Sequence, residues 1–141
     1  MSHYPINEET IPLSNVLTRQ SMLTHYKNNG GMALPFYQQD RVKSRELVAG
    51  VHIRSMWGEK VMMALIDIQA GAEVPLHSHP HEQAGRVLSG AFYLSIGGDT
   101  KLLQEGDHYV IPGGVEHSAR GTDSPSLALD IFSPPREEYK F

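Results

Sequence analysis

The sequence contains no cysteine among its 141 residues, so disulfide bonds, thiolate chemistry and cysteine-type zinc sites are excluded. It also lacks an excess of positive charge, because 12 Lys and Arg stand against 16 Asp and Glu and leave a formal charge of −4. Sequence-independent nucleic-acid binding needs a basic surface that releases counterions, so we expect no nucleic-acid partner. The mixed charges provide no polybasic patch for a membrane surface either.

Long apolar runs are missing too. No stretch approaches the roughly 18 residues that a membrane span needs. The N-terminal region shows no basic start followed by an apolar run, so we expect no signal peptide and no membrane partner. Together with the absence of cysteine, this pattern predicts a cytoplasmic protein. The chain length corresponds to one domain with a short appendage.

The composition changes near residue 41. Residues 1–41 are polar and include the run Asn28-Asn29-Gly30-Gly31, which we interpret as an N-terminal arm that contacts a second subunit. The arm permits one short helix around Leu13 to Tyr26, although its apolar positions fit a helical stripe only partly. Residues 42–141 are predicted to form the folded domain.

From residue 45 onward, short runs rich in β-branched and aromatic residues recur, separated by Gly, Pro and Asp. Such spacing predicts an all-β sandwich or barrel without parallel βαβ units. We expect tight turns at Gly58-Glu59 and Gly97-Gly98-Asp99 and a hairpin at Ser89-Gly90. The expected strands are 46–57, 61–68, 74–79, 82–88, 91–96, 101–103, 107–111, 116–120 and 126–132.

The clearest chemical signal in the sequence is a histidine cluster, His77-Ser78-His79-Pro80-His81-Glu82-Gln83. Residues two apart in a strand point to the same side, so His77 and His79 can present two imidazoles to one point. On a straight strand Gln83 would lie about 13 Å from His79. Because Pro80 interrupts the strand, we expect a turn that brings Gln83 opposite the histidines on the next antiparallel strand.

A second constellation lies downstream, where Gly106 is followed by Pro112-Gly113-Gly114 and then by His117. The proline and glycines predict a turn, and His117 begins the next expected strand. It is the best candidate for a further metal ligand.

These two constellations resemble the two motifs of the cupin superfamily. Gly71, His77, His79, Gln83 and Gly90 have the spacing of the first motif, with Gln in place of the usual Glu, and Gly106, Pro112, Gly114 and His117 have the spacing of the second. The resemblance implies a small antiparallel, jelly-roll-like β-barrel that forms a homodimer. It also implies one divalent metal ion, held by His77, His79, Gln83 and His117. A barrel that has lost its metal is the alternative, and His81 is expected beside the site or in solvent.

The glutamine has a chemical consequence. Three imidazoles and an amide leave the charge of a divalent ion uncompensated, which favours a Lewis acid for an anionic substrate over oxygen activation. This ligand set does not select among Zn, Ni, Mn, Fe and Co.

A narrower resemblance connects the His77–Gly90 region and the C-terminal run from Asp130 to Tyr139 with the KdgF-type cupins of pectin and alginate breakdown. These proteins open the ring of 4,5-unsaturated monouronates to linear 5-keto-4-deoxyuronates. Their Asp-x-Phe-x-x-x-Arg run falls here on Asp130, Phe132 and Arg136, which implies a proton shuttle, a pocket wall and a carboxylate clamp. The implied partner is a small anionic sugar acid. The long N-terminal arm departs from the compact family members.

Other readings remain open. Asp130 can cap a turn, Phe132 can be ordinary core and Arg136 can be a solvated charge, while Tyr93 and Tyr109 are acid–base candidates that are more often packing residues. A different metal-cupin enzyme (a dioxygenase, a polyketide cyclase or a dimethylsulfoniopropionate lyase) or a non-catalytic sugar-acid binding module would also fit the motifs.

Overall fold

The computed structural model describes residues 36–141, and within them β-strands dominate. The first three strands are β1 (Arg45–Val48), β2 (Val51–Trp57) and β3 (Met62–Ile68). They are followed by β4 (Glu73–His77), β5 (Glu82–Ser89), β6 (Ala91–Ile96), β7 (Asp99–Gln104), β8 (His108–Ile111), β9 (His117–Gly121) and β10 (Ser126–Ser133). Two single-turn 3-10 helices, η2 (Gln39–Arg41) and η3 (Glu137–Tyr139), flank the strands.

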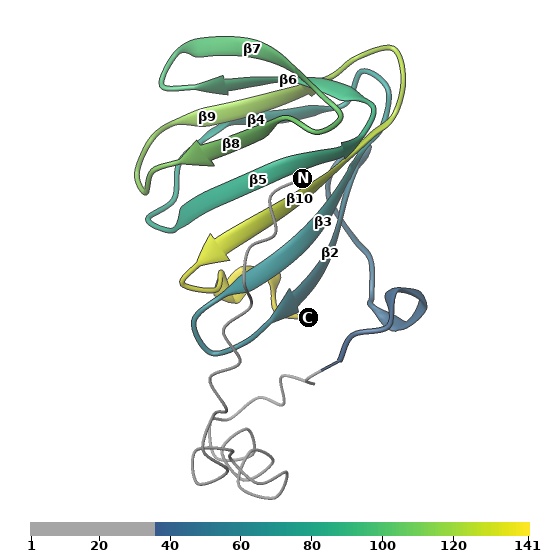
Figure 1. Ribbon diagram of the computed structural model, residues 1–141, viewed down its shortest axis with the longest axis vertical. Helices are drawn as coiled ribbons and strands as arrows, with labels where there is room; N and C mark the ends of the chain where they lie inside the picture. The colour runs from purple at the N-terminus through teal and green to yellow at the C-terminus, as the bar shows by residue number, and fades with distance from the viewer. Residues whose placement is uncertain (1–35) are drawn as a thin grey trace, which may run out of the picture. The chain divides into compact units, whose positions relative to one another are not determined.

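The strands form two sheets in which every pairing is antiparallel. The larger sheet has the order β1-β2-β3-β10-β5-β8, and the smaller one has the order β4-β9-β6-β7. The last strand, β10, therefore lies inside the larger sheet between β3 and β5 (Figure 1). This arrangement confirms the prediction of an all-β, cupin-type barrel.

The core lies between the inner faces of the two sheets. Buried and more exposed residues alternate along β2, β3 and β10, as expected for strands with one face on a core. The side chains that fill the interior are mostly branched aliphatic and aromatic, and the largest of the fully buried ones are Phe92, Phe132, Ile53, Met62, Ile111, Val51 and Val87.

Two details of the predicted strands are wrong. The single strand expected at 46–57 is two strands, because the chain turns at Ala49-Gly50, where Gly50 has a φ of +76°. Ser89-Gly90 does not close a hairpin, since β5 pairs with β8 and β10 whereas β6 pairs with β7 and β9. Gly90 (φ +71°) is instead a corner at which the chain crosses from one sheet to the other.

The expected helix at Leu13–Tyr26 and most of the expected arm lie outside the described residues. Within residues 36–141, no helix is long and apolar enough to cross a membrane.

Candidate metal centre

Three histidines converge where β4 and β9 pair. His77 ends β4, His79 follows it, and His117 begins β9 directly opposite His77. The centroid of the His117 ring lies 4.3 Å from that of His77 and 4.9 Å from that of His79. One nitrogen atom from each ring can be chosen so that all three lie within 4.8 Å of one another. The structure thus brings together the three histidines predicted from the motifs.

Backbone carbonyls orient all three rings. The Nδ1 atoms of His77, His79 and His117 lie 2.8, 3.1 and 2.8 Å from the carbonyl oxygens of Pro75, His81 and Val115, respectively. A carbonyl can only accept, so each Nδ1 carries a proton and donates it, which leaves Nε2 as the atom that each ring can offer to a metal ion. Metal-binding histidines are commonly fixed in this way.

Gln83 reaches the histidines from the opposite sheet. Its Oε1 lies 3.2 Å from His79 Nε2, so the predicted proximity is correct. The predicted route is wrong, because β4 pairs with β9 and not with β5. The chain leaves β4, turns at Pro80 and enters the larger sheet, and the amide approaches the rings across the barrel interior.

The environment favours the neutral form of two of these imidazoles, those of His79 and His117. Burial, followed by the positive charge of Arg136, lowers the pKa of His79 to about 4. Burial also lowers the pKa of His117. A neutral imidazole is the form that binds a metal ion. Three Nε2 atoms and one amide oxygen at the same place therefore fit a divalent ion such as zinc, which takes four ligands.

His81 contributes its backbone to this site. Its carbonyl oxygen accepts the His79 Nδ1–H bond, while its own ring lies 5.6 Å from the ring of His79. Its Nδ1 atom is buried without a hydrogen-bond partner among the described residues. The ring is therefore neither fully in solvent nor part of the three-histidine group.

A cavity of about 70 Å³ lies beside the histidines, between the sheets. Asp130 and Phe132 of β10 both line it and are 7% and 2% exposed, so their shared strand parity places both inside, as predicted. Burial raises the pKa of Asp130 to about 6, although hydrogen bonds from Tyr109 and Gln83 and the charge of Arg136 oppose the shift. Asp130 caps no turn.

Tyr109, one of the two tyrosines named as acid–base candidates, is a neighbour of Asp130. Its hydroxyl donates to Asp130 Oδ1 at 2.5 Å, and its ring lines the cavity. Tyr109 therefore does more than pack, because it also hydrogen bonds to Asp130. Tyr93, by contrast, lies outside this cavity, where Arg120 stacks over its ring at 4.5 Å.

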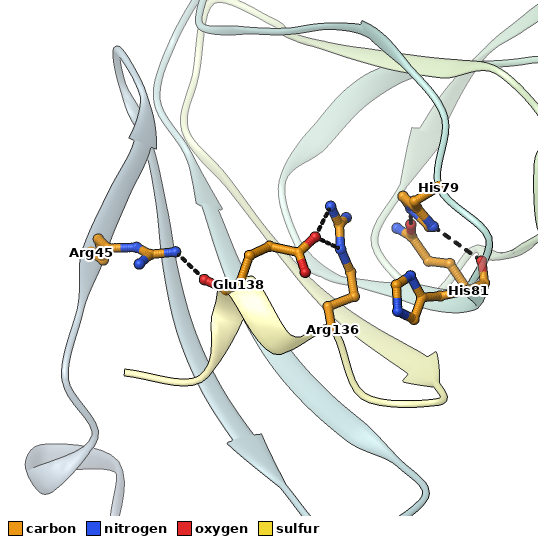
Figure 2. A network of polar contacts seen from close by, with 6 residues as sticks. Arg45, His79, His81, Arg136 and Glu138 are labelled. Atoms are coloured by element: carbon orange, nitrogen blue, oxygen red, sulfur yellow. Dashed lines mark hydrogen bonds and ion pairs between the residues drawn. The ribbon is translucent and has the colours of Figure 1, made fainter.

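Arg136 is 9% exposed and lines the same cavity, so it is not a solvated tail charge. Its guanidinium stacks over Tyr139 at 4.1 Å, and its Nε and Nη2 atoms lie 2.8 and 2.7 Å from Glu138 Oε1. The Glu138 carbonyl in turn accepts a hydrogen bond from Arg45 of β1 at 2.6 Å (Figure 2). Arg45 thereby anchors the short segment that carries Arg136. The sequence offered no signal for Arg45, and within the C-terminal run it assigned no role to Glu138 or Tyr139.

Comparisons with known proteins agree with this architecture. The model of the cupin domain family matches residues 64–132. The pectin degradation protein KdgF of Dickeya dadantii (strain 3937) is 27% identical over 106 residues, which cover 74% of this chain and 96% of that protein.

Two solved structures are similar over nearly their whole length. An RmlC-like cupin from Shewanella frigidimarina NCIMB 400 has a TM-score of 0.71 and 27% identity, and the match covers 75% of this chain and 96% of that one. KdgF from Halomonas sp. has a TM-score of 0.69 and 28% identity, with 73% of this chain and 96% of that chain covered.

A lyase also matches this chain, over a smaller region. The dimethylsulfoniopropionate lyase DddQ of Ruegeria pomeroyi is 36% identical over 69 residues, 48% of this chain. The chain spans only 34% of the length of DddQ.

Proposed function

This chain is a cupin that resembles the KdgF-type proteins, and from that premise we propose that it opens the ring of 4,5-unsaturated uronate monosaccharides. One observation carries the proposal: a buried carboxyl group, Asp130, and a buried guanidinium, Arg136, line the same cavity as Gln83 and two histidines of the three-histidine cluster. Each of these groups can act on a uronate substrate, which has a carboxylate, an acidic hydroxyl and a carbon atom that must be protonated.

We assign the metal to His77, His79, Gln83 and His117. A divalent ion held by four neutral ligands would supply Lewis-acid stabilisation to the carboxylate and ring oxygen of a uronate. The role of the chain is to hold the donor atoms in fixed positions. Backbone carbonyls that accept from Nδ1 orient the three imidazoles, and a hydrogen bond to Asp130 orients the Gln83 amide.

Asp130 is the proposed proton carrier. It would take the proton of the anomeric hydroxyl while the C1–O5 bond breaks, so that C1 becomes a carbonyl and the electron pair goes to O5. It would then return the proton to C4, and the resulting product is a 5-keto acid. A carboxyl group with a pKa of about 6 suits both directions near neutral pH, because it gains and loses a proton readily there.

Arg136 and Phe132 are the proposed binding groups. The guanidinium would bind the uronate carboxylate through a charge-assisted hydrogen bond, and Phe132 would contact the sugar face. In the structure Glu138 already engages two nitrogen atoms of Arg136, which holds the guanidinium at the cavity.

Ring opening can be followed directly. Unsaturated monouronate, prepared from pectate or alginate with a polysaccharide lyase, loses the ultraviolet absorbance of its conjugated C4=C5 bond when the ring opens. We expect faster decay with metal-loaded protein than with chelator-treated protein, and little decay with Asp130→Asn at equal metal content. A metal-loaded wild type that does not accelerate the decay would reject the proposal.

A second candidate is a lyase acting on dimethylsulfoniopropionate, favoured by the region shared with DddQ. It is tested with the same metal-loaded preparation by measuring release of dimethyl sulfide. Binding of a uronate without turnover of either compound would instead favour a non-catalytic sugar-acid binding protein.

The predicted homodimer also remains a proposal, and one surface suits it. Apolar side chains form a row across the outer face of the larger sheet, as the strand registers show: Met56, Met63, Ile131, Ala84 and Val110. Met63, Ile131 and Val110 are 44%, 36% and 60% exposed. We propose that a second copy of the chain covers this row.

Charge complementarity supports that occupant. On β5, the exposed residues Glu82 and Arg86 flank Ala84 on the same face. If two copies pack face to face with their β5 strands antiparallel, each Glu82 meets the Arg86 of the other copy. A two-fold symmetric interface requires this kind of self-complementary surface.

A further inference from the structure

Tyr109, Gly85 and Asp130 occupy one row across three adjacent strands. Tyr109 of β8 is the register partner of Gly85 of β5, which is also the partner of Asp130 of β10. The outer two strands are separated by two strand spacings, about 9–10 Å, so a side chain on the middle strand would normally stand between the two residues. Glycine has no such side chain, and the tyrosine ring passes over β5.

The glycine is needed for space and not for backbone conformation. Gly85 is absent from the glycines with positive φ, so its backbone is one that any residue adopts. A Cβ built at Gly85 would fall on the ring carbons and hydroxyl of Tyr109. Any larger residue at position 85 must therefore displace the tyrosine ring or its own strand.

The tyrosine is held from both ends. Phe92 packs against its ring edge-to-face, with 6.2 Å between the centroids. Its hydroxyl donates to Asp130 Oδ1 at 2.5 Å, and Asp130 also receives a hydrogen bond from Gln83. The carboxyl group is thus fixed between a tyrosine and a glutamine that come from different strands.

We propose that Tyr109 is a positioning residue that holds the Asp130 carboxyl group in its reactive orientation, and that Gly85 is the residue that makes this contact possible. The part of the proposal that concerns turnover depends on the proposed function. Burial, followed by the adjacent Asp130, raises the pKa of Tyr109, which keeps its hydroxyl a donor.

Kinetics test the positioning role. We expect Tyr109→Phe to lower kcat roughly 10- to 100-fold, because small misplacements of a catalytic group have effects of this size, while KM stays within about twofold and the metal content is unchanged. Gly85→Ala should produce the same kcat loss although Tyr109 is present. Tyr93→Phe removes a tyrosine hydroxyl outside the cavity and should leave kcat unchanged. An unchanged kcat in Tyr109→Phe would overturn the positioning role.

A thermodynamic cycle tests the contact without any activity. Urea unfolding of metal-free protein at pH 8 measures the coupling. Tyr109→Phe should raise the unfolding equilibrium constant about tenfold more in the wild-type background than in the Asp130→Asn background, because a hydrogen bond to a charged group is stronger than one to a neutral amide. Equal effects in both backgrounds would reject the contact. The wild type could fail to turn over uronate while the cycle still shows coupling between Tyr109 and Asp130. In that case the ring-opening proposal is wrong, but the contact between Tyr109 and Asp130 is supported.

Discussion

The amide group of Gln83 connects the histidine cluster with Asp130. Its oxygen lies near His79 Nε2, and the side chain also hydrogen bonds to Asp130, for which the amide nitrogen is the donor. A glutamate at this position would have no proton to donate and would place a second carboxylate beside Asp130. The neutral amide would thus keep a second negative charge away from the proposed proton carrier and leave the charge of a bound metal ion uncompensated.

We therefore expect Gln83→Glu to keep its metal but to lose most of its ring-opening rate at pH 7, by roughly tenfold or more. The added like charge raises the pKa of Asp130 further, so the acidic limb of the pH–rate profile should move to higher pH. Metal analysis and initial rates between pH 5 and 9 measure both effects. Gln104→Glu, an exposed change on β7, is the matched control. An unaltered rate would show that the neutral ligand is incidental.

Asp130 should reduce stability at neutral pH. Its folded-state pKa of about 6 lies above the ordinary value of 3.8, so the folded protein favours the protonated carboxyl group. The stability that comes from this preference is fully present below about pH 4 and is lost as the pH rises through 6. Asp130→Asn cannot ionise, so metal-free Asp130→Asn should gain stability over metal-free wild type by about 2–3 kcal/mol between pH 4 and pH 8. Urea unfolding at several pH values checks this. A stability difference that does not change with pH would contradict the burial of the charge.

At the scale of elements, short runs rich in β-branched and aromatic residues predicted most strands, because the Gly, Pro and Asp residues between the runs mark the turns. Of the two errors, one is a missed local turn at Gly50, and the other concerns Gly90, whose role depends on distant strands. Ser89-Gly90 has the composition of a hairpin turn, but β5 pairs with β10 in the larger sheet. The next strand, β6, pairs with β9 in the smaller sheet. A local pattern cannot specify which strand, much later in the chain, becomes the neighbour.

The same limit applies to the site. Motif spacing located His77, His79, Gln83 and His117, and the C-terminal run located Asp130, Phe132 and Arg136. The sequence named Tyr109 only as one of two acid–base candidates and did not identify Arg45, because the roles of both residues arise from register and from contacts across 21 and 93 residues. Gly85 shows no turn signal, since only the tyrosine ring above it requires a glycine.

The C-terminal segment provides an element-scale prediction. Arg45 donates to the Glu138 carbonyl and lies 4.2 Å from the centroid of the Phe141 ring, so it ties η3 to β1. Arg45→Met should loosen the segment that carries Arg136 and raise KM for the uronate by about 3- to 10-fold, the value of one hydrogen bond, with a smaller change in kcat. Arg54→Met, which removes an ion pair with Asp67 on the outer face of the sheet, is the control. Equal KM values for the two variants would argue against this role of Arg45.

At the scale of the whole molecule, the apolar row on the larger sheet predicts the oligomeric state. A lysine in place of Ile131 puts an unpaired charge in the centre of the proposed interface, so Ile131→Lys should convert a dimer to a monomer in multi-angle light scattering. Leu102→Lys puts the same charge at a similarly exposed site (43%) on β7 of the smaller sheet and should leave the dimer intact.

The charged residues beside the apolar row test how the β5 strands of the two copies are oriented in the proposed dimer. Glu82→Lys would place an ammonium group against the Arg86 of the second copy, and like charges in contact across an interface weaken association. Adding Arg86→Glu restores opposite charges in an antiparallel pairing of the two β5 strands, so the double variant should recover the dimer. If the strands instead pack parallel, each residue at position 82 meets its own copy, and the single variant would associate no more weakly than the wild type. A wild type that stays monomeric at all concentrations would remove the interface altogether.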